Sequence, residues 1–190
     1  MTPATDQLLK AAQDAAKQGK LPPVHLWNPE FCGDLDMEIR RDGTWFYEGT
    51  PIGRKPLVRL FSTILKLEDG KYYLVTPVEK VGIRVVDAPF VAVDLEAAGE
   101  GADQSIAFTT NVGDRVVAGA DHAIRVERGE DGVPSPYIHI RAGLEALIDR
   151  KSFYRLVDLG QSHEVDGVEM FGVWSDGQFF PIIPVAELDI

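Results

Sequence analysis

The chain has 190 residues and a mass of 20.9 kDa, which is enough for one large domain or two small ones with an apolar core. Its 30 Asp and Glu residues against 19 Lys and Arg give a net charge of −11. Because that charge repels phosphate backbones and acidic lipid surfaces, we expect the protein to bind neither nucleic acid nor a membrane surface.

The N-terminal segment, residues 1–22, reads as one helix. Thr5 or Asp6 can cap it, alanines dominate its centre, and Pro22 forbids its continuation. The segment has no signal-peptide pattern, and no run of about 18 apolar residues occurs anywhere in the chain. We therefore expect a cytoplasmic protein without membrane insertion.

The first expected domain, residues 23–88, begins with strands. Apolar and acidic side chains alternate over 35–39, a turn follows at 41–43, and residues 44–47 have the composition of a strand. This pattern predicts a β-hairpin with one face exposed to water.

A helix and a second hairpin follow in the same domain. Pro56 suits the first turn of a helix, and apolar residues recur at helical spacing over 57–65. Asp69 and Gly70 then favour a tight turn into a strand over 71–76. One more short strand is expected over residues 83–86 before Pro89, where we place the domain boundary.

The second expected domain, residues 89–190, is again mostly strands. One short helix is expected where Leu144, Leu147 and Ile148 fall at helical spacing. The remaining elements are predicted as strands, at residues 90–95, 106–109, 112–118, 123–126, 137–140, 153–159, 168–174 and 179–183.

The two halves share a short motif. Arg54 and Arg141 each begin the string Arg-x-x-Leu-x-x-Leu, each follows an Asp-Gly turn, and a hairpin follows each expected helix. This similarity predicts internal duplication of an antiparallel α+β unit, so that the fold class is α+β. The alternative is coincidence, because Leu-x-x-Leu occurs in any amphipathic helix.

Positive charge concentrates in the two repeated segments, residues 40–59 and 141–155. Arg54, Lys55 and Arg141 are expected at helix entries, where a cation opposes the helix dipole and a bound anion would relieve that conflict. The sequence therefore suggests an anion site. The alternative is that each arginine is structural and pairs with a carboxylate of this acidic chain.

Motifs for catalysis, cofactors and metals are missing from the sequence. It contains no G-x-S-x-G string, no glycine-rich phosphate loop and no zinc-type histidine spacing. A single cysteine, Cys32, excludes an internal disulfide and a multi-cysteine metal site. Asp34, Asp36 and Glu38 alternate along a strand, which places them in a row rather than around an ion. We therefore expect no cofactor and no metal, and an enzyme is the less favoured class.

Several strings together resemble the bacterial family called domain of unknown function 1285. They lie at residues 43–49, 51–54, 57–62, 73–80, 86–90, 110–114 and 136–144. The resemblance covers nearly the whole chain beyond the N-terminal helix. It implies a duplicated core of two α+β units, of which the C-terminal one is loosely similar to a pleckstrin-homology fold. It further implies a groove between the units that binds a nucleotide-like ligand, with a role in signal transduction.

The combined hypothesis is a two-domain protein that binds a small anionic, nucleotide-like ligand at the interface of its duplicated units. The anion would face Arg54, Arg59 and Arg141. The rings of Trp45 and Tyr137 would stack on a planar group, and the family-motif positions would line the groove. The candidate residues are Trp45, Arg54, Arg59, Thr76, Glu79, Lys80, Asn111, Asp114, Tyr137 and Arg141.

Two other classes stay open. One is an enzyme acting on a similar ligand with Glu79 or Asp114 as the base, which requires a carboxylate or histidine with a displaced pKa in a cleft. The other is a protein-interaction module in which the arginines are structural and a protein partner binds the C-terminal half. That module requires an exposed apolar patch or an open sheet edge.

Overall fold

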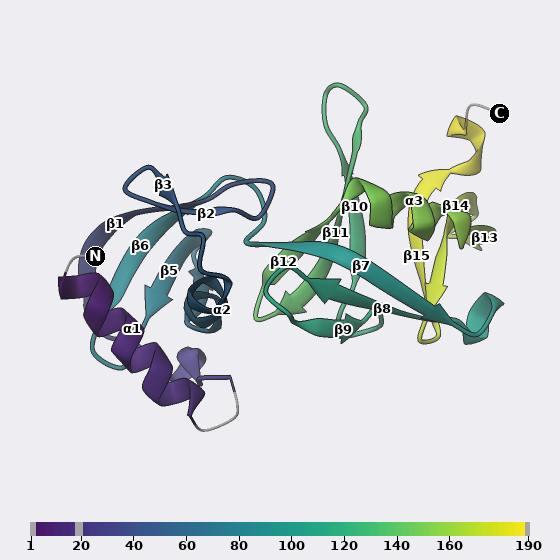
Figure 1. The fold of residues 1–190 in the computed structure, drawn as a ribbon. Helices are drawn as coiled ribbons and strands as arrows, with labels where there is room; N and C mark the ends of the chain where they lie inside the picture. The colour runs from purple at the N-terminus through teal and green to yellow at the C-terminus, as the bar shows by residue number, and fades with distance from the viewer. Residues whose placement is uncertain (1–2, 18–20, 189–190) are drawn as a thin grey trace. The chain divides into compact units, whose positions relative to one another are not determined.

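The chain folds into two compact units, Met1–Pro89 and Phe90–Ile190. The structure is a computed structural model that describes residues 3–17 and 21–188. Each unit is mostly β-strand with few helices and is built on a curled sheet of largely antiparallel strands (Figure 1). Among the described residues, every helix is too short or too polar to cross a membrane.

Unit 1 contains one six-stranded sheet, ordered β3-β2-β1-β6-β5-β4, and two helices. Its elements are α1 (Pro3–Ala16), η1 (Val24–Leu26), β1 (Phe31–Ile39), β2 (Trp45–Tyr47), β3 (Thr50–Pro51), α2 (Lys55–Thr63), β4 (Leu65–Glu68), β5 (Lys71–Val75) and β6 (Lys80–Val85). The two hairpins and the helix predicted here are confirmed. Part of the predicted N-terminal helix, at residues 1–2 and 18–20, lies outside the described residues.

The core of unit 1 forms where the apolar side of α2 meets the sheet. The rings of Phe61 on α2 and Trp45 on β2 are stacked with centroids 6.4 Å apart, and both side chains are buried. The helix α1 lies beside α2 (Figure 1) and buries Leu8 and Ala12, which are four residues apart and so share one face. A hollow lined by residues of β1, β5 and β6 also lies on this sheet.

Unit 2 contains a six-stranded sheet, ordered β10-β11-β12-β7-β8-β9, and a three-stranded sheet, ordered β13-β14-β15, which we call sheet C. Its elements are β7 (Phe90–Ala98), η2 (Gly101–Asp103), β8 (Ser105–Thr110), β9 (Arg115–Val117), β10 (Ile124–Arg128), β11 (Pro134–Arg141), β12 (Leu144–Ile148), α3 (Arg150–Asp158), β13 (Gln161–Val165), β14 (Val168–Ser175), β15 (Gln178–Pro184) and η3 (Val185–Glu187).

Two predicted elements of unit 2 are wrong. Residues 144–148 form strand β12 rather than a helix, and they alternate between buried and half-buried side chains after a tight turn at Ala142 and Gly143. Residues 150–158 form helix α3, although 153–159 was predicted as a strand. The helix is favoured because the Asp149 carboxylate caps it, accepting a hydrogen bond of 2.7 Å from the Ser152 N–H.

The two six-stranded sheets have the same topology. In each, three antiparallel strands are followed by three more, and the first and last strands pair in parallel at the centre. This shared order is consistent with internal duplication. The predicted match of Arg54 with Arg141 is nevertheless wrong, because Arg54 lies between the third and fourth strands and Arg141 ends the fifth.

Sheet C is fastened to the larger sheet of unit 2 by buried polar side chains. The Ser175 hydroxyl donates to the Ala118 carbonyl at 2.7 Å and accepts from the Ile106 N–H at 2.9 Å. The amide of the buried Gln104 donates to the Trp174 carbonyl at 2.9 Å. These bonds hold β14 firmly against the β8 region.

Candidate functional site

The amino end of α2 carries Lys55 and two of the three arginines that were predicted to face an anion. Arg54 precedes the helix, Lys55 is its first residue and Arg59 lies one turn further on the same face as Lys55. All three are exposed, and among the described residues none of them forms an ion pair. The three charges are therefore not neutralised by a neighbouring carboxylate.

The backbone at this helix end offers few free donors. Pro56 has no N–H, and the N–H groups of Leu57 and Val58 bond to the Arg54 carbonyl at 3.0 and 3.2 Å. No side chain caps the helix. An anion here would be held mainly by the side chains of Arg54 and Lys55, with little help from the helix backbone.

Two hollows border Arg54. One has a volume of about 620 Å³ and lies between α1 and α2, where Leu9, Gln13 and Leu60 form its walls. The other has a volume of about 250 Å³ and is lined by Arg54 together with Tyr47 and mainly apolar residues. The charged head of Arg54 thus stands beside space with largely apolar walls.

The amino end of α3 gives a useful comparison. Both α2 and α3 have nine residues and begin with basic side chains, which are Arg150 and Lys151 in α3. In α3, however, the Asp149 carboxylate already occupies the N-cap position. Within the described residues, the protein thus supplies its own anion at α3 and none at α2.

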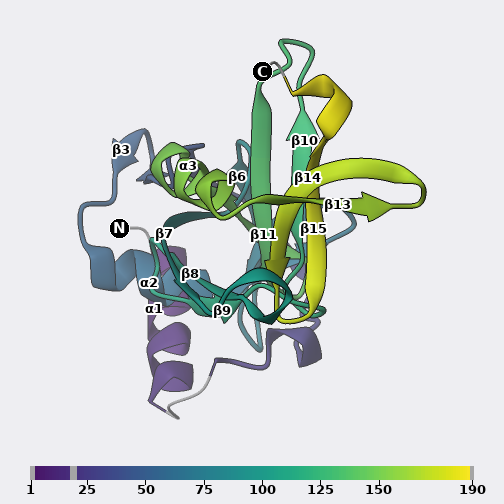
Figure 2. The same ribbon diagram turned by 90° about the vertical axis from the view of Figure 1, so that its right-hand side faces the viewer.

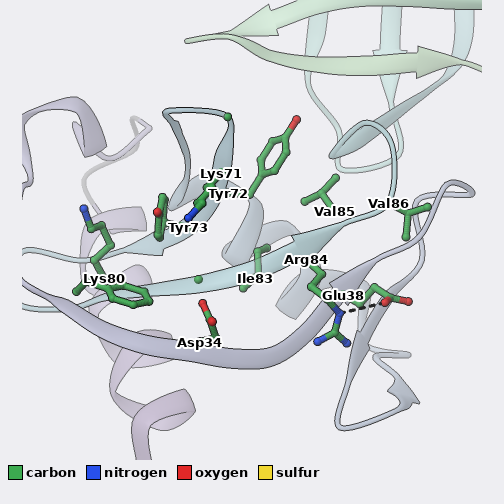
Figure 3. A pocket seen from close by; sticks show the side chains of 13 residues that line it. Asp34, Glu38, Lys71, Tyr72, Tyr73, Lys80, Ile83, Arg84, Val85 and Val86 are labelled. Atoms are coloured by element: carbon green, nitrogen blue, oxygen red, sulfur yellow. Dashed lines mark hydrogen bonds and ion pairs between the residues drawn. The ribbon is translucent and has the colours of Figure 1, made fainter.

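A larger hollow of about 710 Å³ lies on the sheet of unit 1, over β1, β5 and β6 (Figure 3). Aromatic side chains form part of it, since Phe31 and Tyr73 meet edge to face with centroids 6.0 Å apart. Lys80, one of the predicted site residues, lies beside them with its Nζ 5.0 Å from the centre of the Tyr73 ring. The volume of this hollow is within the range of small-molecule sites.

The charges around this sheet hollow are largely paired. Lys80 and Lys66 reach the Glu68 carboxylate at 3.0 and 3.2 Å, and their hydrogen bonds lower the pKa of Glu68 below its usual value. At the other end, Arg84 binds Glu38 at 3.3 Å (Figure 3) and Asp36 at 3.1 Å. The local charge is therefore close to balanced.

Gly82 forms part of the floor of the sheet hollow. A Cβ at this position would lie 2.1 Å from the Asp34 Oδ1, so the carboxylate occupies the space above the glycine. Figure 3 shows Asp34 directed toward the β6 backbone. Of the acids predicted in a row on this strand, Asp34 and Glu38 line the hollow, and Asp36 and Glu38 form ion pairs with Arg84.

Trp45 and Tyr137, expected to stack on a planar ligand, are both buried. Trp45 is 1% exposed within the core of unit 1, and its Nε1 is one of the buried atoms without a hydrogen-bond partner among the described residues. Tyr137 is 5% exposed in unit 2, and the guanidinium of Arg125 lies 4.3 Å from its ring centre. Both rings are therefore packed inside their units, as side chains of the core are.

The family-motif positions Thr76 and Glu79 stabilise a backbone turn. The hydroxyl of Thr76 accepts the Glu79 N–H at 3.0 Å, and the Thr76 N–H donates to the Glu79 carbonyl at 2.8 Å. In unit 2, Asp114 is held similarly by Thr110, and Asn111 accepts the Val91 N–H at 3.0 Å. These side chains and backbone groups shape loops between strands.

Arg141 lies at the end of β11 and not at a helix entry, so the predicted conflict with a helix dipole does not exist for it. Its Nη1 donates to the Asp114 Oδ2 at 2.6 Å, and its Cζ lies 5.0 Å from the centre of the Phe90 ring. Both partners of this ion pair are about one-fifth exposed. This geometry is that of a structural arginine.

Some residues of these sites were not among the predicted ones. Lys55 was expected at the helix entry but was not among the candidate site residues, although residues 49–67 contain four basic residues and no Asp or Glu. Leu9 and Gln13 come from α1, and nothing in the sequence indicates that α1 packs against α2. Phe31 reaches Tyr73 only through the parallel pairing of β1 with β6, which joins distant segments. Among the residues described, no cluster of three potential metal ligands occurs.

The two units, each built on a six-stranded sheet of the same strand order, define a two-domain, mostly β protein. The family models match both parts: the N-terminal model, described as a domain of unknown function (DUF1285), matches residues 22–88, and the C-terminal one, described as a protein of unknown function (DUF1285), matches residues 89–182. The chain belongs to the DUF1285 family, as the sequence resemblance predicted.

Two solved structures of that family are similar to this chain. A DUF1285 family protein from Silicibacter pomeroyi DSS-3 is 60% identical over 96% of this chain and 98% of that chain, with a TM-score of 0.87. One from Shewanella baltica OS155 is 30% identical over 65% of this chain and 91% of that chain, with a TM-score of 0.51. No curated protein matches the chain.

Proposed function

We propose that this protein binds a small anionic ligand, a phosphate or carboxylate, at the amino end of α2. The observation that carries the proposal is the cluster of Arg54, Lys55 and Arg59, which lack ion-pair partners within the described chain. Arg54 borders both hollows and Lys55 borders the larger of the two. In a chain of net charge −11, unneutralised cations on one short helix form a local positive field.

Charge favours this site over the sheet hollow of unit 1. There, Lys80 and Arg84 are already held by carboxylates, so an incoming anion would compete with Glu68, Asp36 and Glu38. At α2 an anion displaces no internal partner. Short-range hydrogen bonds to guanidinium and ammonium groups then supply the affinity, which long-range repulsion by the acidic chain otherwise opposes.

The walls of the hollows indicate the rest of the ligand. Leu9, Leu57 and Leu60 are apolar, whereas Gln13 and Tyr47 offer polar groups beside them. A ligand that combines an anionic head with a planar or apolar part fits such walls, and a nucleotide-like molecule is one example. Arg54 would bind the head between the two spaces.

The remaining parts of the hypothesis drawn from the sequence stay predictions. It includes a ligand at the interface of the two units, a signalling role, a pleckstrin-homology-like C-terminal unit and a cytoplasmic location. We assign no reaction, because Asp114 is ion-paired with Arg141 and Glu79 lines none of the three hollows described above. Binding alone is the function that the geometry supports best.

A thermal-shift screen against phosphorylated and carboxylated metabolites tests the proposal. Compounds that bind the folded chain raise its melting temperature. Replacing Arg54 or Lys55 by Met keeps the apolar stem and removes the charge. Each variant is expected to lose about 1.5–3 kcal/mol of binding free energy, as for a hydrogen bond to a charged group.

The matched control is Lys151→Met, which removes a cation from the amino end of α3, where Asp149 already provides the anion. The proposal predicts ligand-induced shifts that persist in this control and shrink in Arg54→Met and Lys55→Met. Equal shifts in all four proteins would reject the α2 site. A screen without any anionic hit would reject the proposed function.

A further inference from the structure

Sheet C carries an exposed aromatic cluster that the anion site does not involve. The ring of His163 on β13 lies 4.8 Å from that of Trp174 on β14 and 4.9 Å from that of Phe179 on β15, measured between centroids. Trp174 and Phe179 are 5.4 Å apart. His163 is exposed and the other two rings are half-buried, so all three reach the surface.

The strand β13 is an open edge. It is the terminal strand of sheet C, and its residues 161–164 are all exposed. Figure 2 shows the β13–β14 hairpin extending away from the rest of unit 2. Because hydrogen-bonded and non-hydrogen-bonded residues alternate along an antiparallel pair, every second residue of β13 directs its N–H and C=O away from β14.

The surroundings of this edge are acidic. Residues 156–190 contain seven Asp and Glu residues and no Lys or Arg. Glu164 and Glu169 face each other in the β13–β14 register, and Asp166 lies in the connecting turn. These three are exposed, and in the described parts of the chain they form no ion pair. Facing acids repel, so a cation between Glu164 and Glu169 would stabilise the hairpin.

The surface is held in place from beneath. Phe179 packs so closely on Gly172 that a Cβ there would lie 2.8 Å from its ring. The Trp174 carbonyl and the Ser175 hydroxyl are bonded to the β8 region and to Gln104. Rigid aromatic rings beside an open strand lower the entropic cost of binding a partner.

We propose that β13 and the His163–Trp174–Phe179 cluster form a docking surface for a basic, extended segment of a partner protein. The segment would add as a strand along β13, with backbone hydrogen bonds giving affinity. Its Lys or Arg side chains would meet Glu164 and Glu169, and its alternate side chains would lie on the aromatic rings. A second copy of this chain would bring equal acidic charge to the same edge, and nucleic acid would be repelled.

The test measures binding of a labelled, end-capped peptide of alternating Lys and Val to the full-length chain by fluorescence anisotropy. The expected result is saturable binding. The same peptide with Glu in place of Lys should not bind, and N-methylation of alternate peptide bonds should weaken binding by about tenfold, because it removes the backbone donors of one peptide edge. Equal affinity for the N-methylated peptide would overturn the proposal, since attraction would then be purely electrostatic.

Protein variants separate this surface from net charge. The double variant Glu164→Lys/Glu169→Lys should weaken peptide binding by about tenfold or more, and His163→Ala should weaken it by severalfold. The matched control, Glu30→Lys/Glu130→Lys, has the same net charge and changes exposed positions outside sheet C. It should bind like the unchanged protein. Equal weakening by both double variants, or self-association through β13 in place of peptide binding, would overturn the proposal.

Discussion

Arg141 and Arg54 share a sequence motif but differ in their surroundings. Arg141 is fixed by Asp114 at 2.6 Å, whereas Arg54 has no ion-pair partner among the described residues. The residue that keeps its charge free is the one available for an external anion. A motif match between two arginines therefore did not predict a shared role.

Replacing Arg141 by Met should lower the free energy of unfolding by about 1–2 kcal/mol, because it leaves the Asp114 carboxylate without its guanidinium in a partly buried place. Anion binding at α2 should not change. Urea unfolding of Arg141→Met, Asp114→Asn and the double variant checks this by a mutant cycle. Additive effects of the two single changes would contradict a direct ion pair.

The Lys80–Glu68 pair gives a pH prediction. Hydrogen bonds from Lys80 and Lys66 lower the pKa of Glu68 from its usual 4.5 in the folded chain. A carboxyl with a lowered folded pKa stabilises the fold above its unfolded pKa, and that contribution is lost as the pH falls through the folded pKa. Lys80→Met should therefore melt lower than the unchanged protein at neutral pH. The difference should shrink as the pH is lowered below 4.5, and a difference independent of pH would refute the pairing.

At the scale of elements, the sequence predicted those of unit 1 better than those of unit 2. The hairpin at β1–β2 follows from alternation and a glycine turn, and α2 follows from Pro56 and apolar spacing. In unit 2 the helix predicted at residues 144–148 is a strand, and the strand predicted at residues 153–159 belongs mainly to helix α3. Leu144, Leu147 and Ile148 fit a helix and a strand equally in so short a window, and only the pairing of β12 with β7 and β11 decides.

The attachment of sheet C depends on Ser175. Its buried hydroxyl makes two hydrogen bonds to the backbone of the β8–β9 region, so Ser175→Ala leaves the Ile106 N–H and the Ala118 carbonyl without that partner. We expect a loss of about 1–3 kcal/mol in unfolding free energy. Ser162→Ala on the exposed strand β13 should change stability by less than about 0.5 kcal/mol. Equal denaturation midpoints for the two variants would contradict this role of Ser175.

At the scale of the whole molecule, the two-unit organisation and the family could be predicted, but the composition of the sites could not. The central parallel pairs, β1 with β6 and β7 with β12, join segments far apart in sequence. They bring Phe31 to Tyr73 and create the sheet hollow, and no local pattern indicates such pairings. Trp45 was a plausible ligand-stacking residue by its place in the basic segment, yet its ring completes the core against Phe61.

Charge is separated along the chain. Residues 49–67 have basic residues and no acid, and residues 156–190 have acids and no Lys or Arg. Each region lies within one unit, around α2 in the first and sheet C in the second. Unit 1 thus contains the proposed anion site, and unit 2 contains the proposed surface for a basic segment.

The most direct test of the central claim is a backbone-amide NMR titration of the full-length chain with inorganic pyrophosphate. The account predicts saturable shifts concentrated at Gly53, Arg54 and Lys55 and at the facing Leu9 and Gln13 of α1, and their loss in Arg54→Met. Amides at the start of α3 should not move, because Asp149 already caps that helix. Shifts centred on α3 or on the sheet hollow, or no saturable shift at the start of α2, would contradict an anion site at α2.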